Sequence, residues 1–279
     1  MTILTFSLLL LIISYLAGFV GALTGLGGGI VLIPALVLLF HVDIHYAMGA
    51  SLISVMATSS GTAIAYLKNG YINIRIGMFL ETGAVIGALL GAILVAYLST
   101  NLIAVIFGLF LFLSAFFTWK RNEEKEIPAT ASHPWSEYLR LNGSVPTTKG
   151  IKPYKVQNAP LALFIMTIAG SLSGLLGIGS GALKVLAMDQ AMRLPYKVST
   201  TTSNFIIGIT AAVGAGVYFS YGYINPVLTF PVLIGVLFGA LTGARTLTKI
   251  ASKTLRTGFA IVILVLGIEM IYKGISGNL

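Results

Sequence analysis

The chain repeats itself, because an ungapped shift of 152 residues, from Gly25 to Gly177, lays its second half on its first. Identical residues coincide throughout the two halves. The shift places Gly25, Gly27 and Gly29 on Gly177, Gly179 and Gly181, Ser51 on Ser203, Thr58 on Thr210, and residues 70–73 on 222–225. Self-similarity at a fixed shift indicates a duplicated structural unit. Any fold for this chain must therefore be one that can be built twice.

Each half consists of apolar stretches long enough to form membrane helices. Hydrophobic residues make up 57% of the chain and charged residues only 9%, against about 25% charged in a soluble domain. About 20 helical residues cross the hydrocarbon core. The apolar stretches are 3–22, 30–40, 46–66, 76–98 and 102–119, then 158–176, 182–192, 198–219, 224–248 and 255–273. We expect an all-α polytopic bundle of about 8–10 transmembrane segments in the cell (inner) membrane.

A polar stretch separates the two halves. Residues 120–157 carry half of the acidic residues together with several lysines and prolines. We expect three parts: a first membrane repeat (1–119), a polar cytoplasmic linker (120–157) and a second membrane repeat (158–279). The first residues carry no positive charge, so they are interpreted as the first span and not as a cleaved signal peptide.

Glycines interrupt the apolar sequence at matching positions of the two halves, in the first glycine segment (17–29) and the second glycine segment (169–181). Broken helices at corresponding positions of two repeats are typical of transporter binding sites. Irregular backbone at membrane depth is tolerated only where protein or a water-filled cavity satisfies its polar groups. The two glycine segments are therefore predicted to form the centre of a substrate pathway.

The placement of lysine and arginine decides how the halves are oriented. If each glycine segment lay inside a single crossing, the basic loops would divide between both faces of the membrane. If the chain turns back there, as two spans or as a re-entrant hairpin, the basic loops at 68–75, 120–157, 193–197 and 249–256 share one face. The positive-inside rule favours the second arrangement. It predicts two inverted repeats, with the basic loops in the cytoplasm and both termini outside.

A second glycine pattern predicts how helices pack. Glycine recurs every fourth residue at Gly83, Gly87 and Gly91, and again at Gly235, Gly239 and Gly243. Small residues on one helix face let two helices approach closely in lipid. These glycines are therefore predicted to be structural and not ligand contacts.

The pattern Gly-Phe-x-Gly-x-x-x-Gly-Leu-Gly-Gly-Gly, from Gly18 to Gly29 and followed by Pro34, resembles the TauE/SafE sulfite exporter family, the four-toluene-sulfonate uptake permeases. The resemblance covers both halves without the linker. It implies secondary transport, by alternating access, of sulfite or an organosulfonate such as sulfoacetate or sulfolactate. An anion channel or a transporter of another small solute is the alternative. A membrane enzyme or an assembly subunit is an alternative of a different class.

An anion needs hydrogen-bond donors that replace its hydration, and two groups of residues could supply them. Backbone N–H groups at new helix starts are one group: Gly27, Gly28, Gly29, Gly179, Ser180 and Gly181. Hydroxyl and amide side chains are the other: Ser51, Thr201, Thr202, Ser203 and Asn204. The alternative for the glycines is a tight turn or helix contact. For the hydroxyls it is capping and inter-helix hydrogen bonding.

Charges inside the apolar stretches are costly unless they are paired or functional. Lys184 follows the second glycine segment closely and is the leading cationic contact for an anion, although it could instead pair with Asp189 or snorkel. Glu81 is a candidate proton-coupling carboxylate, or a paired residue that bridges helices. Asp189 and Arg193 are spaced as a structural i,i+4 pair.

Several classes of function are excluded or disfavoured. The chain has no cysteine and no H-E-x-x-H pattern, so we expect no metal site of those kinds, no cofactor and no enzymatic activity. Without a G-x-x-x-x-G-K-[ST] loop, the energy source would be a gradient, with protons as a coupling ion. The net charge of +9 lies mostly in connecting segments. It is therefore assigned to topology in the lipid bilayer and not to nucleic-acid binding.

Overall fold

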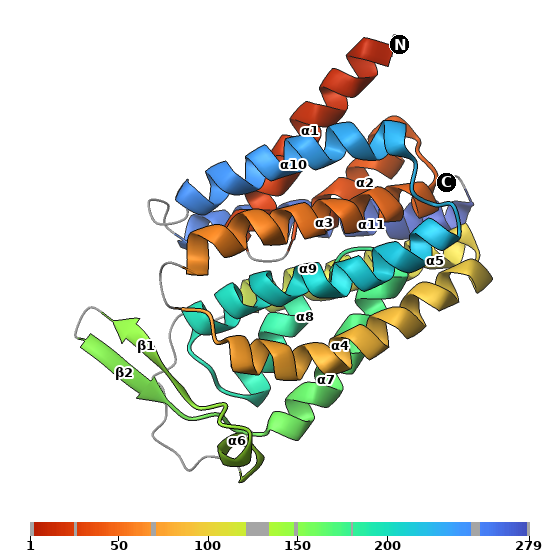
Figure 1. The fold of residues 1–279 in the computed structure, drawn as a ribbon. Helices are drawn as coiled ribbons and strands as arrows, with labels where there is room; N and C mark the ends of the chain where they lie inside the picture. Colours follow the sequence, from red (N-terminus) through yellow and green to blue (C-terminus); the bar gives the residue numbers. More distant parts are fainter. Residues whose placement is uncertain are drawn as a thin grey trace.

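In a computed structural model, the chain is a bundle of helices with a small two-stranded sheet at one end (Figure 1). The structure describes residues 3–24, 27–67, 71–120, 134–147, 150–179, 181–246 and 252–277. The first half contains α1 (Ile3–Thr24), α2 (Gly29–Phe40), α3 (Ile44–Leu67), α4 (Ile74–Leu94) and α5 (Thr100–Lys120). The second half contains α7 (Ala159–Leu176), α8 (Gly181–Leu186), α9 (Tyr196–Ser220), α10 (Pro226–Thr246) and α11 (Ser252–Ser276). The predicted all-α membrane bundle is thereby confirmed.

The chain turns back at both glycine segments. Phe6 near the start of α1 packs on Phe40 at the end of α2, with ring centroids 5.4 Å apart. In the second half, Gln157 just before α7 donates from its backbone N–H to the carbonyl of Met192, just after α8 and its π-helical continuation (Ala187–Ala191). The 12 residues of α2 span only about 18 Å at 1.5 Å per residue, against a hydrocarbon core of about 30 Å. Each glycine segment thus joins a full-length helix to a half-length helix that returns.

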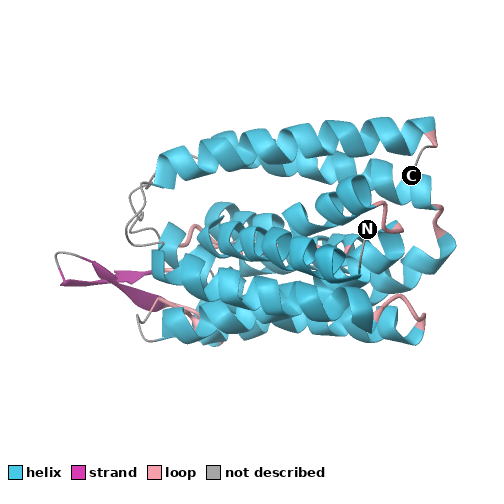
Figure 2. Ribbon diagram, turned by 90° about the horizontal axis from the view of Figure 1, so that it is seen from above, coloured by secondary structure: helices cyan, strands magenta, loops and turns pink. Residues whose placement is uncertain are grey.

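The helices pack in pairs that respect the duplication. α1 packs on α10, and their counterparts under the 152-residue shift, α7 and α4, also pack together. α3 packs on its own counterpart α9, and α5 on its counterpart α11. In Figure 2 the helices run from the end of the bundle that carries the hairpin to the opposite end, and Figure 1 shows that α1 and α7 are inclined to the other helices. Among the described residues, five helices are long and apolar enough to cross a membrane.

Glycine brings the backbones of paired helices together, as predicted. A Cβ at Gly87 would overlap the carbonyl oxygen of Thr167 on α7, and one at Gly91 would overlap that of Ser171. On α10, a Cβ at Gly239 would overlap the carbonyl oxygen of Tyr15 on α1. Close backbone approach through small residues is how membrane helices associate, since lipid supplies no hydrophobic drive between them.

The linker is partly folded, which the sequence analysis did not predict. It forms α6 (Pro134–Tyr138) and an antiparallel hairpin of β1 (Gly143–Thr147) and β2 (Gly150–Tyr154) that projects from one end of the bundle (Figures 1 and 2). Its buried residues Leu141, Val145 and Tyr154 join a core cluster with Ile76 of α4 and Met166 of α7. These apolar side chains, spread thinly among polar ones, anchor the linker to the membrane helices.

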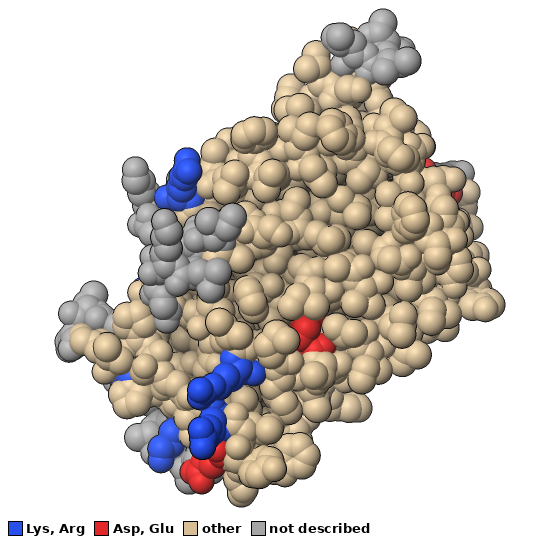
Figure 3. All heavy atoms as spheres, viewed as in Figure 1, with Lys and Arg blue, Asp and Glu red and all other residues tan. Residues whose placement is uncertain are grey.

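Lysine and arginine gather at the end of the bundle that carries the linker, whereas the sides of the helices in this view are almost entirely uncharged (Figure 3). The exposed basic residues include Arg75, Arg140, Lys152, Arg193 and Arg245. Parts of three of the four basic loops lie outside the described residues, namely 68–70, 121–133 with 148–149, and 249–251.

Replacing Gly87 by alanine should destabilise the protein by about 1–3 kcal/mol, the usual cost of overpacking, because the new Cβ would push α4 away from α7. This loss is expected despite the better helix propensity of alanine. Thermal unfolding of the detergent-solubilised protein measures it. In the control Gly216→Ala, the added Cβ meets nothing within 4 Å, so stability should be unchanged or higher. Equal stability of the two variants would contradict the packing role.

Candidate functional site

Two opposite charges are buried against each other inside the bundle. The Nζ of Lys184 on α8 lies 3.3 Å from Oε2 of Glu81 on α4. The ammonium also donates to the hydroxyl of Thr210 on α9, and that hydroxyl donates to Oε1 of Glu81. Lys184 and Thr210 are fully buried and Glu81 is 3% exposed. We call these three residues the buried charge cluster.

Local structure places each member of the buried charge cluster. α8 begins immediately after the second glycine segment, and Cβ atoms tilt toward the start of a helix, so the long side chain of Lys184 reaches back toward α9. Glu81 lies two turns into α4, and Gly77, one turn earlier, lets α4 approach α9. A Cβ at Gly77 would be 2.9 Å from Cγ2 of Ile206. Three helices from both halves therefore meet at one ion pair.

The cluster satisfies its own charges at a cost in desolvation. An isolated buried ion is very unfavourable, and a buried pair is tolerated only when additional hydrogen bonds complete it. Thr210 supplies those bonds to both partners. The result is a neutral arrangement in which each charge has its counter-ion and the Thr210 hydroxyl contacts both.

The structure decides between several alternatives. Lys184 pairs with Glu81 and not with Asp189, and Glu81 bridges α4 to α8. The residues of the expected Asp189–Arg193 pair do not share one regular helix, and the pair itself stays a prediction. Asp189 lies in the π-helical turn, and Arg193 lies beyond it with a left-handed backbone (φ 53).

Thr210 was not among the predicted site residues. The signal that could have identified Thr210 is that the 152-residue shift aligns it with an identical residue, Thr58. The same shift aligns Lys184 with Leu32 and Glu81 with Leu233, so neither charge is repeated. The cluster therefore exists in one copy only, and the symmetry of the sequence could not reveal it.

The two glycine segments meet inside the bundle. Ser51 on α3 donates to the carbonyl oxygen of Gly177 at 2.6 Å, and a Cβ at Gly29 would overlap the same Ser51 hydroxyl. Gly27 and Gly179 have left-handed backbones, with φ of 80° and 71°, which glycine adopts readily. Both lie against Ile207 of α9. Gly28 directly precedes α2 as its N-cap, and its carbonyl accepts from the N–H groups of residues 31 and 32.

The hydroxyl side chains predicted to bind substrate bond to the backbone of neighbouring segments instead. Thr201 donates to the carbonyl of Lys197 at 2.7 Å, and Thr202 accepts from the backbone N–H of Asn73 at 3.1 Å. Their hydroxyls therefore serve helix and loop contacts near the linker. Ser203 donates to the carbonyl of Gly181, the first residue of α8, at 3.4 Å. Ser180 lies outside the described residues.

Asn204 differs from the three predicted residues that precede it, although the hydroxyls of Ser199 and Thr200 are also buried without a partner among the described residues. Its backbone carbonyl accepts from Ser59 at 2.6 Å, but its side-chain nitrogen is buried and has no partner among the described residues. A buried amide donor without a partner costs free energy, and native structures usually explain it by a bound group. Asn204 is therefore the predicted residue with the most evident capacity to bind a ligand.

Comparisons with known proteins agree on the kind of molecule. The family model described as sulfite exporter TauE/SafE matches residues 10–270. The chain is 30% identical to the probable membrane transporter protein YunE of Bacillus subtilis, over 96% of this chain and 98% of the relative. It is 28% identical to the probable membrane transporter protein YdhB of the same organism, over 95% and 100%. A probable membrane transporter protein of Methanocaldococcus jannaschii is 24% identical over 94% of each chain. No solved structure matches the chain.

Breaking the ion pair from one side should destabilise the protein strongly. Lys184→Met leaves the Glu81 carboxylate buried without a counter-ion, which costs about 3–5 kcal/mol. The double variant Lys184→Met/Glu81→Gln should recover most of that loss, because no charge remains. Unfolding in mixed detergent micelles measures both, with exposed Arg245→Gln as a control expected to change stability by less than about 0.5 kcal/mol. Additive effects of the two single substitutions would contradict the pairing.

Proposed function

This chain belongs to the sulfite exporter TauE/SafE family, and on that premise we propose that it is a secondary transporter of small sulfur-containing anions. Its substrate is sulfite or an organosulfonate such as sulfoacetate or sulfolactate. The observation that carries the proposal is the buried ammonium of Lys184, held by a carboxylate from another helix beside the second glycine segment. The relatives are named as membrane transporters, which favours transport over catalysis.

The residues around Lys184 suit an anion with several acceptor oxygens. The ammonium supplies charge and up to three donors. Thr210 offers a hydroxyl that already contacts Lys184, and elsewhere on the same helix α9 Asn204 offers a buried amide nitrogen that has no partner among the described residues. In this proposal the anion takes the place of Glu81 beside Lys184, and Ser51 and Ser203 stabilise the glycine turns that flank the pathway.

Competition between Glu81 and the anion couples transport to protons. The empty site is neutral because the ammonium and the carboxylate cancel. When Glu81 takes up a proton it releases Lys184, and one anionic group of the substrate, hydrogen sulfite or the sulfonate of sulfoacetate or sulfolactate, then pairs with the ammonium. One proton and one substrate anion therefore cross together, since an ammonium buried without a counter-ion is strongly unfavourable.

The duplication provides the means of alternating access. We propose that the two halves are inverted repeats, with the linker and the basic loops on the cytoplasmic side. The exchanged pairing of α1 with α10 and of α7 with α4 supports this relation. Rocking of these paired units against α3 and α9 would open the site to each side in turn. A passive anion channel, the alternative, would need no such movement and no proton.

Flux into proteoliposomes tests the proposal. Labelled sulfite, sulfoacetate and sulfolactate should enter saturably, and an imposed pH gradient should accelerate their entry. Lys184→Ala should lower the flux by about tenfold or more, the effect of losing a charge-assisted hydrogen bond. Arg245→Gln, on an exposed basic residue away from the buried charge cluster, should leave the flux unchanged.

Glu81→Gln separates coupling from binding. The amide keeps the shape of the side chain but cannot exchange a proton, so anion counterflow without a gradient should persist while acceleration by the gradient disappears. If the pH gradient still accelerates anion flux in Glu81→Gln, Glu81 is not the residue that couples transport to protons. No flux of any sulfur oxyanion, in protein shown to be folded, would remove the substrate class.

A further inference from the structure

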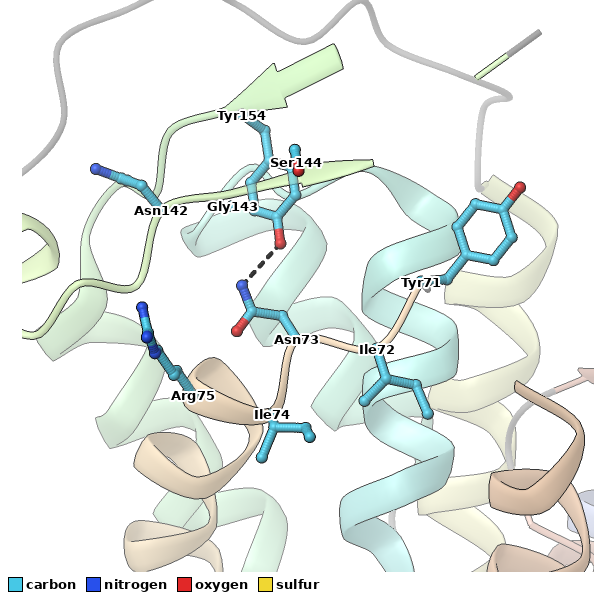
Figure 4. Close-up of a pocket in the computed structure, with 9 residues that line it drawn as sticks. All are labelled: Tyr71, Ile72, Asn73, Ile74, Arg75, Asn142, Gly143, Ser144 and Tyr154. Atoms are coloured by element: carbon cyan, nitrogen blue, oxygen red, sulfur yellow. Dashed lines mark hydrogen bonds between the residues drawn. The ribbon is translucent and has the colours of Figure 1, made fainter. Parts of the chain in front are cut away.

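A polar cavity lies at the linker end of the bundle, away from the buried charge cluster. It has a volume of about 290 Å³ and separates the start of α4 from the linker (Figure 4). Residues 71–75 form one wall, and residues 142–144 with Tyr154 form the other. Arg75 precedes Glu81 by six residues, which is about 9 Å along the helix at 1.5 Å per residue. We call this space the linker cavity.

The charge of the linker cavity is positive. Arg75 is the one charged residue among the nine that line it, and none of the nine is acidic. Its guanidinium makes a 3.4 Å bond to the carbonyl of Arg140, which uses one of its five N–H donors. Nearby, the ammonium of Lys197 lies 5.8 Å from the centroid of the Tyr71 ring. The electrostatic field at this end of the bundle therefore favours an anion.

A buried donor faces the linker cavity as well. The side-chain nitrogen of Asn73 donates to the hydroxyl of Tyr154 at 2.8 Å (Figure 4) and to the carbonyl of Leu141 at 3.2 Å. Tyr154 is only 3% exposed, and its own hydroxyl hydrogen has no acceptor among the described residues. Burial raises the pKa of this phenol, so it remains a neutral donor at physiological pH.

Glycine keeps this wall open. A Cβ at Gly143 would lie 2.8 Å from Cζ of Tyr154 and 2.9 Å from the side-chain nitrogen of Asn73. Any larger residue would press on the hydrogen bond between these two side chains and fill space beside the phenol. Gly143 has an ordinary backbone conformation, so its backbone does not require glycine.

Comparison of the two halves shows that the helix start at α4 has features that the equivalent helix start at α10 lacks. Asn225, the counterpart of Asn73, caps α10 by accepting from the N–H of Val227 at 2.9 Å, much as Asn73 caps α4 by accepting from Ile76 at 3.1 Å. Val227 itself is the counterpart of Arg75. The capping turn was therefore duplicated, whereas the arginine and the facing linker occur at one copy only.

We propose that the linker cavity binds a small oxyanion group, a sulfonate or phosphate, through the Arg75 guanidinium and the Tyr154 hydroxyl, with Ser144 at its rim. The linker cavity, at about 290 Å³, lies just below the range of about 300–1,000 Å³ that is common for pockets of drug-sized ligands. It therefore suits a small oxyanion group. The group can belong to a soluble anion or to the headgroup of an anionic lipid. This site does not depend on the proposed transport, so a failure of either proposal leaves the other intact.

Calorimetric titration of the purified full chain in neutral detergent with inorganic phosphate tests the soluble source. Arg75→Gln should weaken binding about tenfold or more, as expected for a hydrogen bond from a charged donor. Tyr154→Phe, which removes only the hydroxyl, should weaken it severalfold. Arg245→Gln is the matched control on the same end of the bundle and should change nothing. Binding that persists in Lys184→Met/Glu81→Gln but falls in Arg75→Gln belongs to the linker cavity.

Lipid vesicles test the other source. The thermal stability of the protein is compared in phosphatidylcholine alone and with added phosphatidylglycerol. Stabilisation by the anionic lipid that is lost in Arg75→Gln would assign the linker cavity to a headgroup, even if free phosphate does not bind. The proposal is overturned if neither phosphate nor phosphatidylglycerol has an effect, or if Arg75→Gln matches the wild type in both assays.

Discussion

The interior of the bundle depends on one physical requirement, that a charge removed from water must find its counter-ion inside the protein. Lys184 meets this requirement only because Glu81, which lies more than a hundred residues earlier, reaches it from another helix. Thr210 connects the two and belongs to a third helix. The ion pair therefore ties both halves of the chain together. It is also the point where an incoming anion or proton would change how the halves are held.

Glycine makes that meeting possible by two separate physical effects. At Gly27, Gly177 and Gly179 the backbone is left-handed, so the chain can reverse within the bundle and start a half-length helix. At Gly77 and Gly87 the absence of a Cβ lets α4 lie directly against α9 and α7. The first effect positions α8 and Lys184, and the second positions α4 and Glu81. On α9, the buried amide of Asn204 has no partner among the described residues, so a ligand could use it.

The linker makes the two ends of the bundle unlike each other. Asn73 and Asn225 cap equivalent helices, but only Asn73 also bonds to linker residues, Leu141 and Tyr154. Apolar residues of the linker pack against α4 and α7, and exposed basic residues surround them. A duplicated membrane unit has thus acquired a polar structure at one end, and the linker cavity is formed where the two meet.

Local sequence is enough to predict the membrane class, the duplication, the helix boundaries to within a few residues, the reversals at the glycines and the packing role of Gly87 and Gly91. These follow from local composition and spacing, because hydropathy and glycine periodicity act over one or two helix turns. Lys184 and Glu81 could be named separately, since any charge in an apolar stretch requires an explanation. Their pairing, the role of Thr210 and the folded linker were decided only by tertiary structure. They depend on which helices come together. Glu81 lies 103 residues before Lys184, so the sequence around Lys184 does not indicate that the two side chains meet.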